Sequence, residues 1–166
     1  DGIILRQIKQ LGLDVDLIGG ASYGSIDITV KIAGEDAEGI YAIVDFSDRD
    51  PNPAGQWFVN EMKERYDLAG GGGSSWCYDG TLILADAMRR AGIVKEIDGK
   101  KMIMPIEQAR EAIRVALGQT KDFGPEQGAT KNYTADKLND LAHSMLVIRI
   151  KDGQHEIVET VELEIT

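Results

Sequence analysis

The residues best suited to bind a small molecule lie in the run Ala21–Ser25, which follows two consecutive glycines. An apolar run ends at those glycines and helical spacing begins after them. The start of a helix presents free backbone N–H groups to an anion or a carbonyl oxygen. Ser22 and Ser25 add hydroxyl groups, and Tyr23 adds an aromatic surface with a polar tip. We therefore expect a ligand-binding site formed by Ala21, Ser22, Tyr23 and Ser25, with a serine that only caps the helix as the alternative.

A second group of candidates ends the next apolar run, Gly39–Phe46, and is followed by Ser47. Ligands of open α/β sheets bind at the carboxyl ends of strands. We expect Asp45 and Phe46 to contribute to the same ligand-binding site. For Asp45, solvation in a loop or helix capping is the alternative.

Sulfur and imidazole chemistry is poorly supported by the sequence. The single cysteine, Cys77, excludes an internal disulfide and a zinc site built on paired thiolates, and a buried free thiol is its expected state. Neither histidine is a candidate, and His155 falls in an expected hairpin strand whose alternation accounts for it. We therefore expect no catalytic residue, no metal and no cofactor.

Other conspicuous residues are better explained by structure than by chemistry. Gly70–Ser75 has no lysine after its glycines and no strand before them, which indicates a flexible connection and not a phosphate-binding loop. Asp79 follows Tyr78 at the expected start of a helix, where it complements the positive end of the dipole. Trp57 and Trp76 are expected to pack against the protein, not to stack on a ligand.

The composition excludes two classes of partner. The chain has 166 residues, of which 43% are hydrophobic, enough for a core. Its 28 acidic residues outnumber 18 lysines and arginines, and the formal charge of −10 repels the phosphates of nucleic acids and of anionic membranes. No apolar run approaches the roughly 20 residues of a membrane helix. Residues 1–3 carry no export signal, so if the protein is exported we expect its start to be missing from this sequence.

The first part of the chain alternates between helix and strand patterns. Apolar residues at helical spacing predict a first helix that ends at Gly12. The elements expected here are helices over residues 3–11 and 23–33 and strands over residues 15–20 and 39–46. The second strand is almost continuously apolar, so we expect it to be covered on both faces. This order predicts an α/β fold with a parallel sheet flanked by helices.

The rest of the chain adds helices and a closing hairpin. A polar, proline-marked loop occupies residues 48–53. Asp98–Gly99 predicts a tight turn, and Asp152–Gly153 predicts a hairpin between antiparallel strands. The helices expected are residues 54–66, 79–91 and 106–117, the last ended by Gly118, and the closing strands are residues 145–150 and 156–161.

Several short segments, taken in order, resemble the type I periplasmic solute-binding proteins of ABC transporters, in the branched-chain amino-acid class. The resemblance includes a strand ended by glycines, a hinge crossing and a closing strand with its turn. The segments that carry it are Leu17–Gly20, Ile32–Tyr41, Phe46–Pro53, Phe58–Tyr66, Tyr78–Asp79, Leu82–Arg90 and Met145–Gly153. Together they cover nearly the whole chain in the order that the family has.

The resemblance implies the later part of a two-lobed protein that closes on a solute by a hinge motion and is presented to a membrane permease. It implies that residues 1–47 belong to the C-terminal lobe, residues 48–120 cross to the N-terminal lobe and residues 121–166 return. It also implies a periplasmic or other extracytoplasmic location. The rest of the cleft would come from the missing N-terminal part of the same protein or from a swapped copy.

The resemblance also bears on the identity of the solute. Family members that bind α-amino acids commonly place a carboxylate at the strand end where this chain has Ala21 and Ser22. A buried ammonium needs an opposite charge, so either the ligand lacks an ammonium or the charge comes from elsewhere. Our hypothesis from the sequence is an organic or aromatic carboxylate or an amide, and not a simple α-amino acid.

Two rival functions fit the same pattern of elements. One is an α/β enzyme with a cleft at the same strand ends, although no nucleophile elbow, dinucleotide fingerprint or phosphate-binding loop supports it. The other is a ligand-sensing domain of a receptor, which has the same fold and signals instead of delivering solute.

Overall fold

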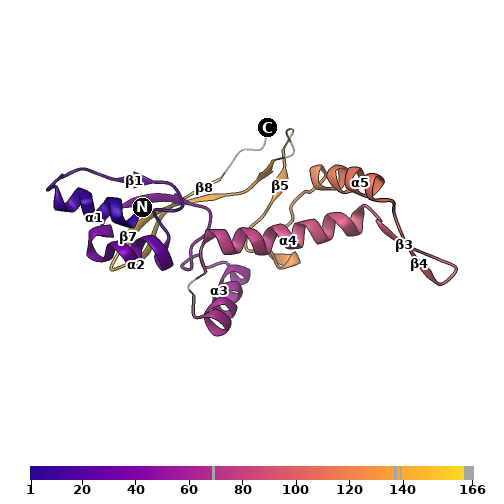
Figure 1. The fold of residues 1–166 in the computed structure, drawn as a ribbon, viewed down its shortest axis with the longest axis horizontal. Helices are drawn as coiled ribbons and strands as arrows, with labels where there is room; N and C mark the ends of the chain where they lie inside the picture. The colour runs from indigo at the N-terminus through magenta and orange to yellow at the C-terminus, as the bar shows by residue number, and fades with distance from the viewer. Residues whose placement is uncertain (69, 137, 139, 163–166) are drawn as a thin grey trace. The chain divides into compact units, whose positions relative to one another are not determined.

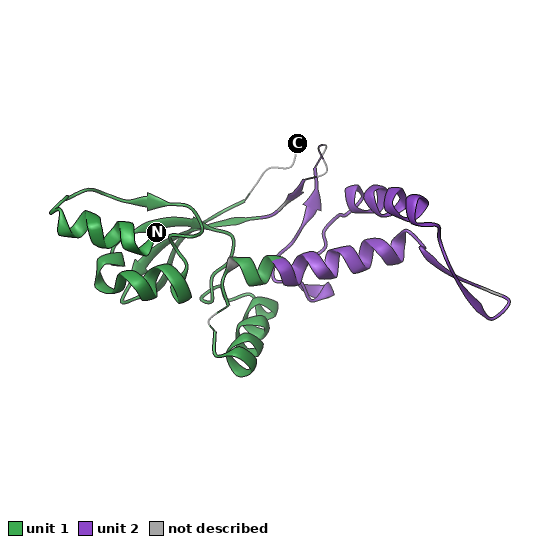
Figure 2. Ribbon diagram, in the orientation of Figure 1, with its two compact units in different colours: residues 1–76, 144–163 green, residues 77–143, 164–166 purple. Residues whose placement is uncertain are grey.

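The computed structural model describes residues 1–68, 70–136, 138 and 140–162. The chain forms two compact units, coloured separately in Figure 2. Of the described residues, those up to Trp76 and those from Ser144 onward form unit 1, and those from Cys77 to His143 form unit 2. The assignment of lobes made from the sequence, with borders after residues 47 and 120, stays a prediction.

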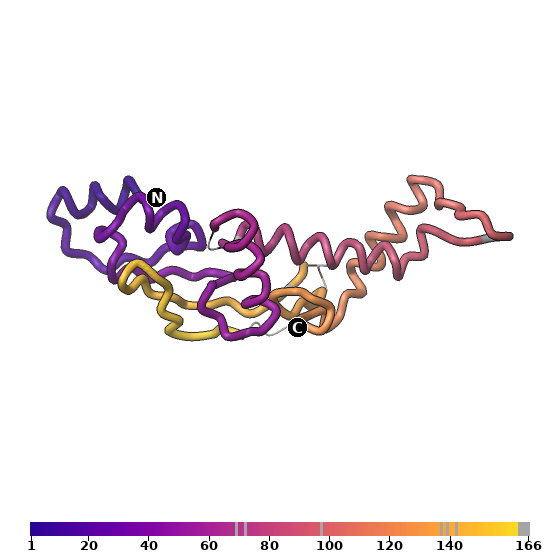
Figure 3. Tube along the Cα trace, turned by 90° about the horizontal axis from the view of Figure 1, so that it is seen from below, coloured from indigo at the N-terminus to yellow at the C-terminus, as the bar shows by residue number. Residues whose placement is uncertain are grey.

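Unit 1 is built on a four-stranded sheet in the order β1-β2-β7-β8 (Figure 1). β1 (Ile18–Gly19) runs parallel to β2 (Tyr41–Val44), β2 is antiparallel to β7 (Met145–Lys151), and β7 is antiparallel to β8 (Gln154–Val161). Figure 3 shows the yellow end of the chain beside the violet strand β2. The α/β fold and the closing hairpin are confirmed, whereas the strand expected over residues 15–20 has only two residues.

The core of unit 1 lies on one face of this sheet. The predicted first helix is α1 (Gly2–Gln10), which buries Leu5 against alternate residues of β2 and β7. The core residues are Leu5, Val30, Ala33, Ala37, Ile40, Ala42, Val44, Leu146, Ile148 and Ile150. Ile43 points to the other face and is 45% exposed. The expectation that β2 is covered on both faces is therefore wrong for the described residues, because the helices of unit 1 pack on one face and successive strand residues alternate between faces.

The segment before β2 is less regular than the single helix predicted over residues 23–33. It contains a turn at Ala21–Gly24, then η1 (Ile26–Val30), α2 (Lys31–Ala33) and η2 (Gly34–Ala37). The first residues of the prediction are wrong because the N–H group of Tyr23 donates to the Gly20 carbonyl and that of Ser25 to the Ser22 carbonyl. These bonds hold a tight turn ahead of the helical residues.

The helix predicted over residues 54–66 is α3 (Pro53–Tyr66), whose N-terminus is capped by the Asn52 side chain. The flexible connection predicted for Gly70–Ser75 is wrong, because α4 (Gly72–Arg90) begins within it. The N–H groups of Ser74 and Ser75 donate to the Gly71 carbonyl and form the first turn of α4. Glycine disrupts a helix least at its end, where the N–H groups have no partner within the helix.

Unit 2 contains the longer part of α4 and the elements that follow it. These are β3 (Val94–Ile97), β4 (Lys100–Ile103), α5 (Ile106–Gly118), η3 (Pro125–Gln127), β5 (Thr134–Ala135) and β6 (Leu141–Ala142). The hairpin of β3 and β4 projects beyond the ends of α4 and α5 (Figures 1 and 3). It turns at Asp98–Gly99 as predicted, with both residues at positive φ. Gly118 is the last residue of α5, and Gln119, not Gly118, caps the helix.

The core of unit 2 contains a buried carboxylate. Asp79 lies within α4, beside a cluster of Ile83, Phe123, Ala129 and Tyr133. It accepts hydrogen bonds from the Thr130 N–H at 2.8 Å, the Thr130 hydroxyl at 2.6 Å and the Tyr133 hydroxyl at 2.7 Å. The predicted role of Asp79 at a helix start is wrong because α4 begins at Gly72, and the carboxylate instead ties the segment after α5 to this helix.

Among the described residues, no helix is both long enough and apolar enough to cross a membrane.

Candidate functional site

A hollow of about 670 Å³ in unit 1 brings together most of the residues predicted to bind a ligand. It lies where the turn after β1, the end of β2, the start of α4 and β8 meet. Ala21, Ser22, Ser25, Asp45 and Phe46 all line it. Tyr23, the remaining candidate, packs against the core of unit 1 and is not among the described lining residues. Contact of these residues with a ligand stays a prediction.

The turn Ala21–Gly24 is held from within by hydrogen bonds. The Thr29 hydroxyl donates to the Ser22 carbonyl at 2.7 Å, which links the turn to η1. Ser25 occupies the position before η1, but its side chain makes no capping hydrogen bond. The alternative in which the Ser25 side chain caps the helix is therefore wrong, and Ser25 is among the residues that line the hollow.

The second group of candidates is set by the end of β2. Asp45 and Phe46 are both buried, which excludes the alternative that Asp45 is a solvated loop residue. The Phe46 ring packs edge-on against the ring of Phe58 on α3, with centroids 5.6 Å apart. This contact joins the end of β2 to α3, and both Asp45 and Phe46 line the hollow.

His155 on β8 is a residue of the hollow that the sequence interpretation missed. The pattern of the hairpin indicated an exposed strand residue, but its side chain is only 7% exposed. Its Nδ1 atom lies 3.0 Å from the Ser47 Oγ atom, and its Nε2 atom lies 2.5 Å from the Gly24 carbonyl oxygen. No local pattern could reveal these contacts, because the partners precede His155 by 108 and 131 residues.

The charge of the hollow is negative. Asp27, Asp45 and Asp48 line it, and the described lining residues include no lysine or arginine. The Asp48 Oδ1 atom lies 3.7 Å from Nδ1 of His155. Carboxylates at the wall of a partly enclosed hollow favour a cationic group, such as an ammonium, over an anion.

The start of α4 supplies an aromatic wall to the same hollow. Trp76 lines the hollow and is 49% exposed, so the expectation that it packs against the protein is wrong. Trp57, on α3, is 51% exposed and is not among the described lining residues. Gly70, Gly71 and Gly73 also line the hollow, so this glycine-rich segment borders it as backbone without side chains.

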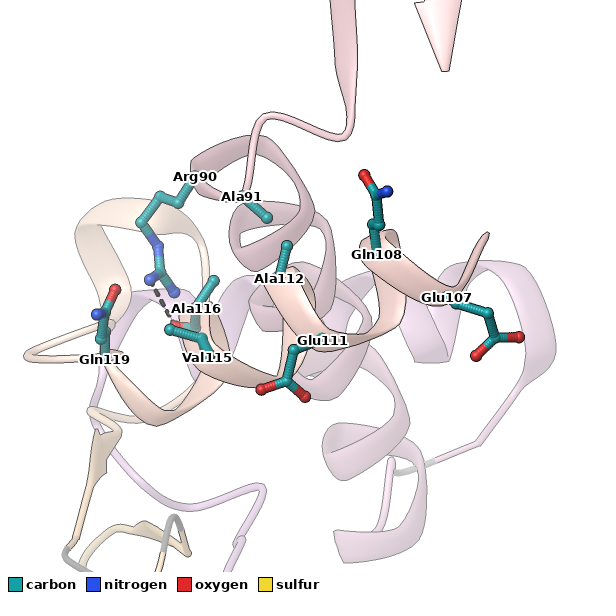
Figure 4. Close-up of a pocket in the computed structure, with 9 residues that line it drawn as sticks. All are labelled: Arg90, Ala91, Glu107, Gln108, Glu111, Ala112, Val115, Ala116 and Gln119. Atoms are coloured by element: carbon teal, nitrogen blue, oxygen red, sulfur yellow. Dashed lines mark hydrogen bonds between the residues drawn. The ribbon is translucent and has the colours of Figure 1, made fainter. Parts of the chain in front are cut away.

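Unit 2 carries a separate groove of about 730 Å³ along α5 and the end of α4 (Figure 4). The Arg90 side chain lies at one end of the groove, where it donates to the Ala116 carbonyl at 2.6 Å and to the Thr120 hydroxyl at 3.0 Å. Glu107 and Glu111 lie along α5 and pair with Arg110 and Arg114. The charged side chains that line this groove, those of Arg90, Glu107 and Glu111, thus all have partners within the protein.

The remaining reactive residues do not form a site. Cys77 is exposed, not buried as expected, and His143 packs its ring against that of Tyr133 at 5.3 Å. Within the part of the chain that the structure describes, no three His, Cys, Asp or Glu residues are grouped so as to hold a metal ion.

Solved structures with this arrangement of elements are binding proteins of transporters. A leucine-binding protein, LivK, from Thermotoga maritima has a TM-score of 0.74 and 25% identity, over 97% of this chain and 41% of that one. The substrate-binding protein LivJ from Streptococcus pneumoniae, in complex with isoleucine, has a TM-score of 0.70 and 19% identity, over 98% and 41%. An ABC-transporter solute-binding protein from R. palustris, in complex with benzoate, has a TM-score of 0.72 and 12% identity, over 99% and 42%. The fold is that of the type I periplasmic binding proteins.

A family model described as periplasmic binding protein matches residues 3–154, and the chain belongs to this family. A comparison with curated proteins finds no match. The chain spans 41–42% of the length of the three solved proteins named above.

Proposed function

We propose that this chain is part of the extracytoplasmic, periplasmic solute-binding component of an ABC transporter, and that the hollow in unit 1 is its share of the solute site. The observation that carries the proposal is the convergence of the turn after β1 and the end of β2 on one hollow in a chain of this family. Ligands of open α/β sheets bind outside such strand ends. The chain binds and releases solute and performs no chemistry on it.

The ligand we propose carries a protonated amine and an apolar body, as an amino acid does. The sequence hypothesis of a ligand without an ammonium rested on Ala21 and Ser22, which lack a charge. The carboxylates of Asp27, Asp45 and Asp48 at the same hollow favour the other alternative, in which the opposite charge comes from elsewhere in the chain. Among the similar solved structures, LivJ is in complex with isoleucine and the R. palustris protein with benzoate, so both kinds of solute belong in the test.

Closure of the site needs a second wall. We propose that it comes from the N-terminal part of the same protein or from a swapped copy of this chain, and that a hinge motion brings it over the hollow. Exclusion of water would then strengthen the attraction between the ammonium and the carboxylates. The closed form is the one that a membrane permease would recognise.

The test is a titration calorimetry panel on the protein, taken as its full polypeptide wherever this chain is part of a longer one. Leucine, isoleucine and 3-methylbutylamine carry the amine, whereas 4-methyl-2-oxopentanoate and benzoate do not. We expect the amine-bearing compounds to bind at least about tenfold more tightly, because each charge-assisted hydrogen bond to a carboxylate is lost without the amine. Tight binding of benzoate or of the oxo acid, with none of the amines, would overturn the proposed ligand class.

A matched pair of tryptophan variants locates the site. Trp76→Ala should weaken binding about tenfold, because an aromatic face at the hollow is removed. Trp57→Ala is the control, since Trp57 has nearly the same exposure and is not among the described lining residues. Equal affinities of the two variants in calorimetry would move the site away from the hollow.

A further inference from the structure

The His155 side chain joins two segments that line the hollow and lie far apart in the sequence. One is the turn Ala21–Gly24 after β1, and the other is the crossing segment that begins with Asp45 at the end of β2. His155 contacts the first segment at the Gly24 carbonyl and the second at the Ser47 hydroxyl. Ser47 is itself buried, so both contacts are shielded from solvent.

The chemistry of the partners sets which ring nitrogen carries the proton. A carbonyl oxygen only accepts hydrogen bonds, so Nε2 of His155 must donate to Gly24 at 2.5 Å. In the neutral ring, Nδ1 is then an acceptor and the Ser47 hydroxyl donates to it at 3.0 Å. The Ser47 oxygen in turn accepts the Arg49 N–H at 3.1 Å. A continuous chain of hydrogen bonds therefore runs from the crossing segment through the ring to the turn.

The turn also packs closely against β2, so a small displacement of its backbone changes what it presents to the hollow. Gly24 is buried, and a Cβ atom at its position would lie only 2.7 Å from Cγ1 of Val44 on β2. The turn is thus packed against β2 on one side and held at its carbonyl by His155 on another. Ser22 and Ser25 lie on either side of Gly24 in the sequence and also line the hollow. The position of the Gly24 backbone therefore affects where both serines lie.

We propose that His155 is the positioning residue of the solute site. It holds the Gly24 carbonyl through Nε2 and thereby presents Ser22 and Ser25 to the ligand, while its Nδ1 atom fixes Ser47 beside Asp45. This proposal rests on the proposed function of the hollow. A role as a mere structural tie between β8 and the rest of unit 1 is the alternative that the test must exclude.

Two variants separate the contacts of the ring. The side-chain amide of His155→Gln reaches as far as Nε2 and retains a donor for Gly24, whereas that of His155→Asn reaches only as far as Nδ1 and retains a partner for Ser47. Calorimetry with the tightest-binding amine of the panel, on the full polypeptide, should show His155→Gln within about threefold of the natural protein and His155→Asn at least about tenfold weaker. Urea unfolding midpoints of the two variants should agree with each other. Equal affinity of the two variants would overturn the proposal, as would a loss that follows the fall in unfolding midpoint.

Hydrogen exchange read by mass spectrometry keeps this inference separate from the proposed function. In the ligand-free protein, peptides that cover residues 21–25 should exchange faster in His155→Asn than in His155→Gln, while peptides from β7 stay unchanged. If no solute of the panel binds the natural protein, the proposed function fails and the exchange result alone decides whether His155 holds the turn. Unchanged exchange of residues 21–25 in His155→Asn would overturn the inference even if solutes bind.

Discussion

The two units each contain a buried polar cluster that ties distant segments together, and the clusters differ in what lies next to them. In unit 1, His155 bonds to Ser47 and Gly24 beside the hollow. In unit 2, Asp79 bonds to Thr130 and Tyr133 beside an apolar core, and it is not among the described residues that line the hollow or the groove. The same kind of hydrogen bond thus serves a binding surface in one unit and the fold in the other.

The two clusters also differ in the cost of losing the central residue. A neutral imidazole makes two ordinary hydrogen bonds, whereas the carboxylate of Asp79 accepts three, one of them from a backbone N–H. Bonds to a charged acceptor are worth about twice as much as neutral ones. Mutation of Asp79 should therefore act on stability, and mutation around His155 should act on binding.

The largest effect is expected from Asp79→Ala. It leaves the Thr130 N–H and hydroxyl and the Tyr133 hydroxyl without their acceptor in a buried site, which should cost about 3 kcal/mol or more in the free energy of unfolding of unit 2. Urea unfolding followed by circular dichroism measures it. Glu107→Ala removes an exposed ion pair and is the control, with little change expected. A loss for Asp79→Ala no larger than that of the control would break the comparison between the clusters.

An intermediate effect is expected from a pair of hydroxyl deletions, one in each cluster. Ser47→Ala removes the partner of Nδ1 of His155 and should lower the free energy of unfolding by about 1–2 kcal/mol. It should weaken solute binding by no more than about threefold, because Nε2 still donates to Gly24. Thr130→Val removes a partner of Asp79 and should lower stability by a similar amount with the affinity of the folded protein unchanged. Calorimetry and urea unfolding on both variants give the two readouts. A larger loss of affinity in Thr130→Val than in Ser47→Ala would contradict the division of roles.

The smallest expected effect is the contribution of Asp86, on α4, to the free energy of unfolding, and this contribution should depend on pH. Burial raises the pKa of Asp86, but hydrogen bonds from Arg89 and Arg90 outweigh that effect and hold the pKa below its ordinary value. Because the folded pKa is lower than the unfolded one, this stabilisation is present above the unfolded pKa and is lost as the pH falls through the folded pKa.

The measurement is the difference in unfolding free energy between the natural protein and Asp86→Asn at two pH values. The difference should be at most about 1 kcal/mol at neutral pH and should shrink on acidification below the ordinary pKa of an aspartate, as the carboxylate takes up a proton. A difference that grows on acidification would contradict the sign of the pKa shift.

Much of the fold follows from local patterns in the sequence. Apolar spacing located α1, α3 and α5, and the two Asp-Gly pairs located the turns at Asp98 and Asp152, where all four residues have positive φ. The strand ends located Ala21, Ser22, Ser25, Asp45 and Phe46 at the hollow. Such features depend on neighbours along the chain, and these are visible in one sequence.

The errors arose where a local pattern is compatible with more than one structure, or where a distant segment decides which residues are covered. The glycines that follow Gly70 indicated a loop, but α4 begins among them, at Gly72. Trp76 was expected to pack against the protein, but it is half exposed. The sequence could not show this, because the exposure of Trp76 depends on which surfaces the rest of unit 1 covers. The apolar sequence of β2 predicted a strand covered on both faces, but the helices of unit 1 cover only one face of this strand.

By itself the sequence determined the helices, the hairpin turns, the strand ends and the negative charge, because periodicity, turn chemistry and composition act over a few residues. Only the tertiary structure decided that His155 forms hydrogen bonds with Gly24 and Ser47, and that Asp79 forms them with Thr130 and Tyr133. It also decided that carboxylates from η1 and from the end of β2 line one hollow. The hydrogen bonds among these residues join positions that are 51 to 131 residues apart. Their partners are chosen by how the chain packs, and no local pattern encodes that choice.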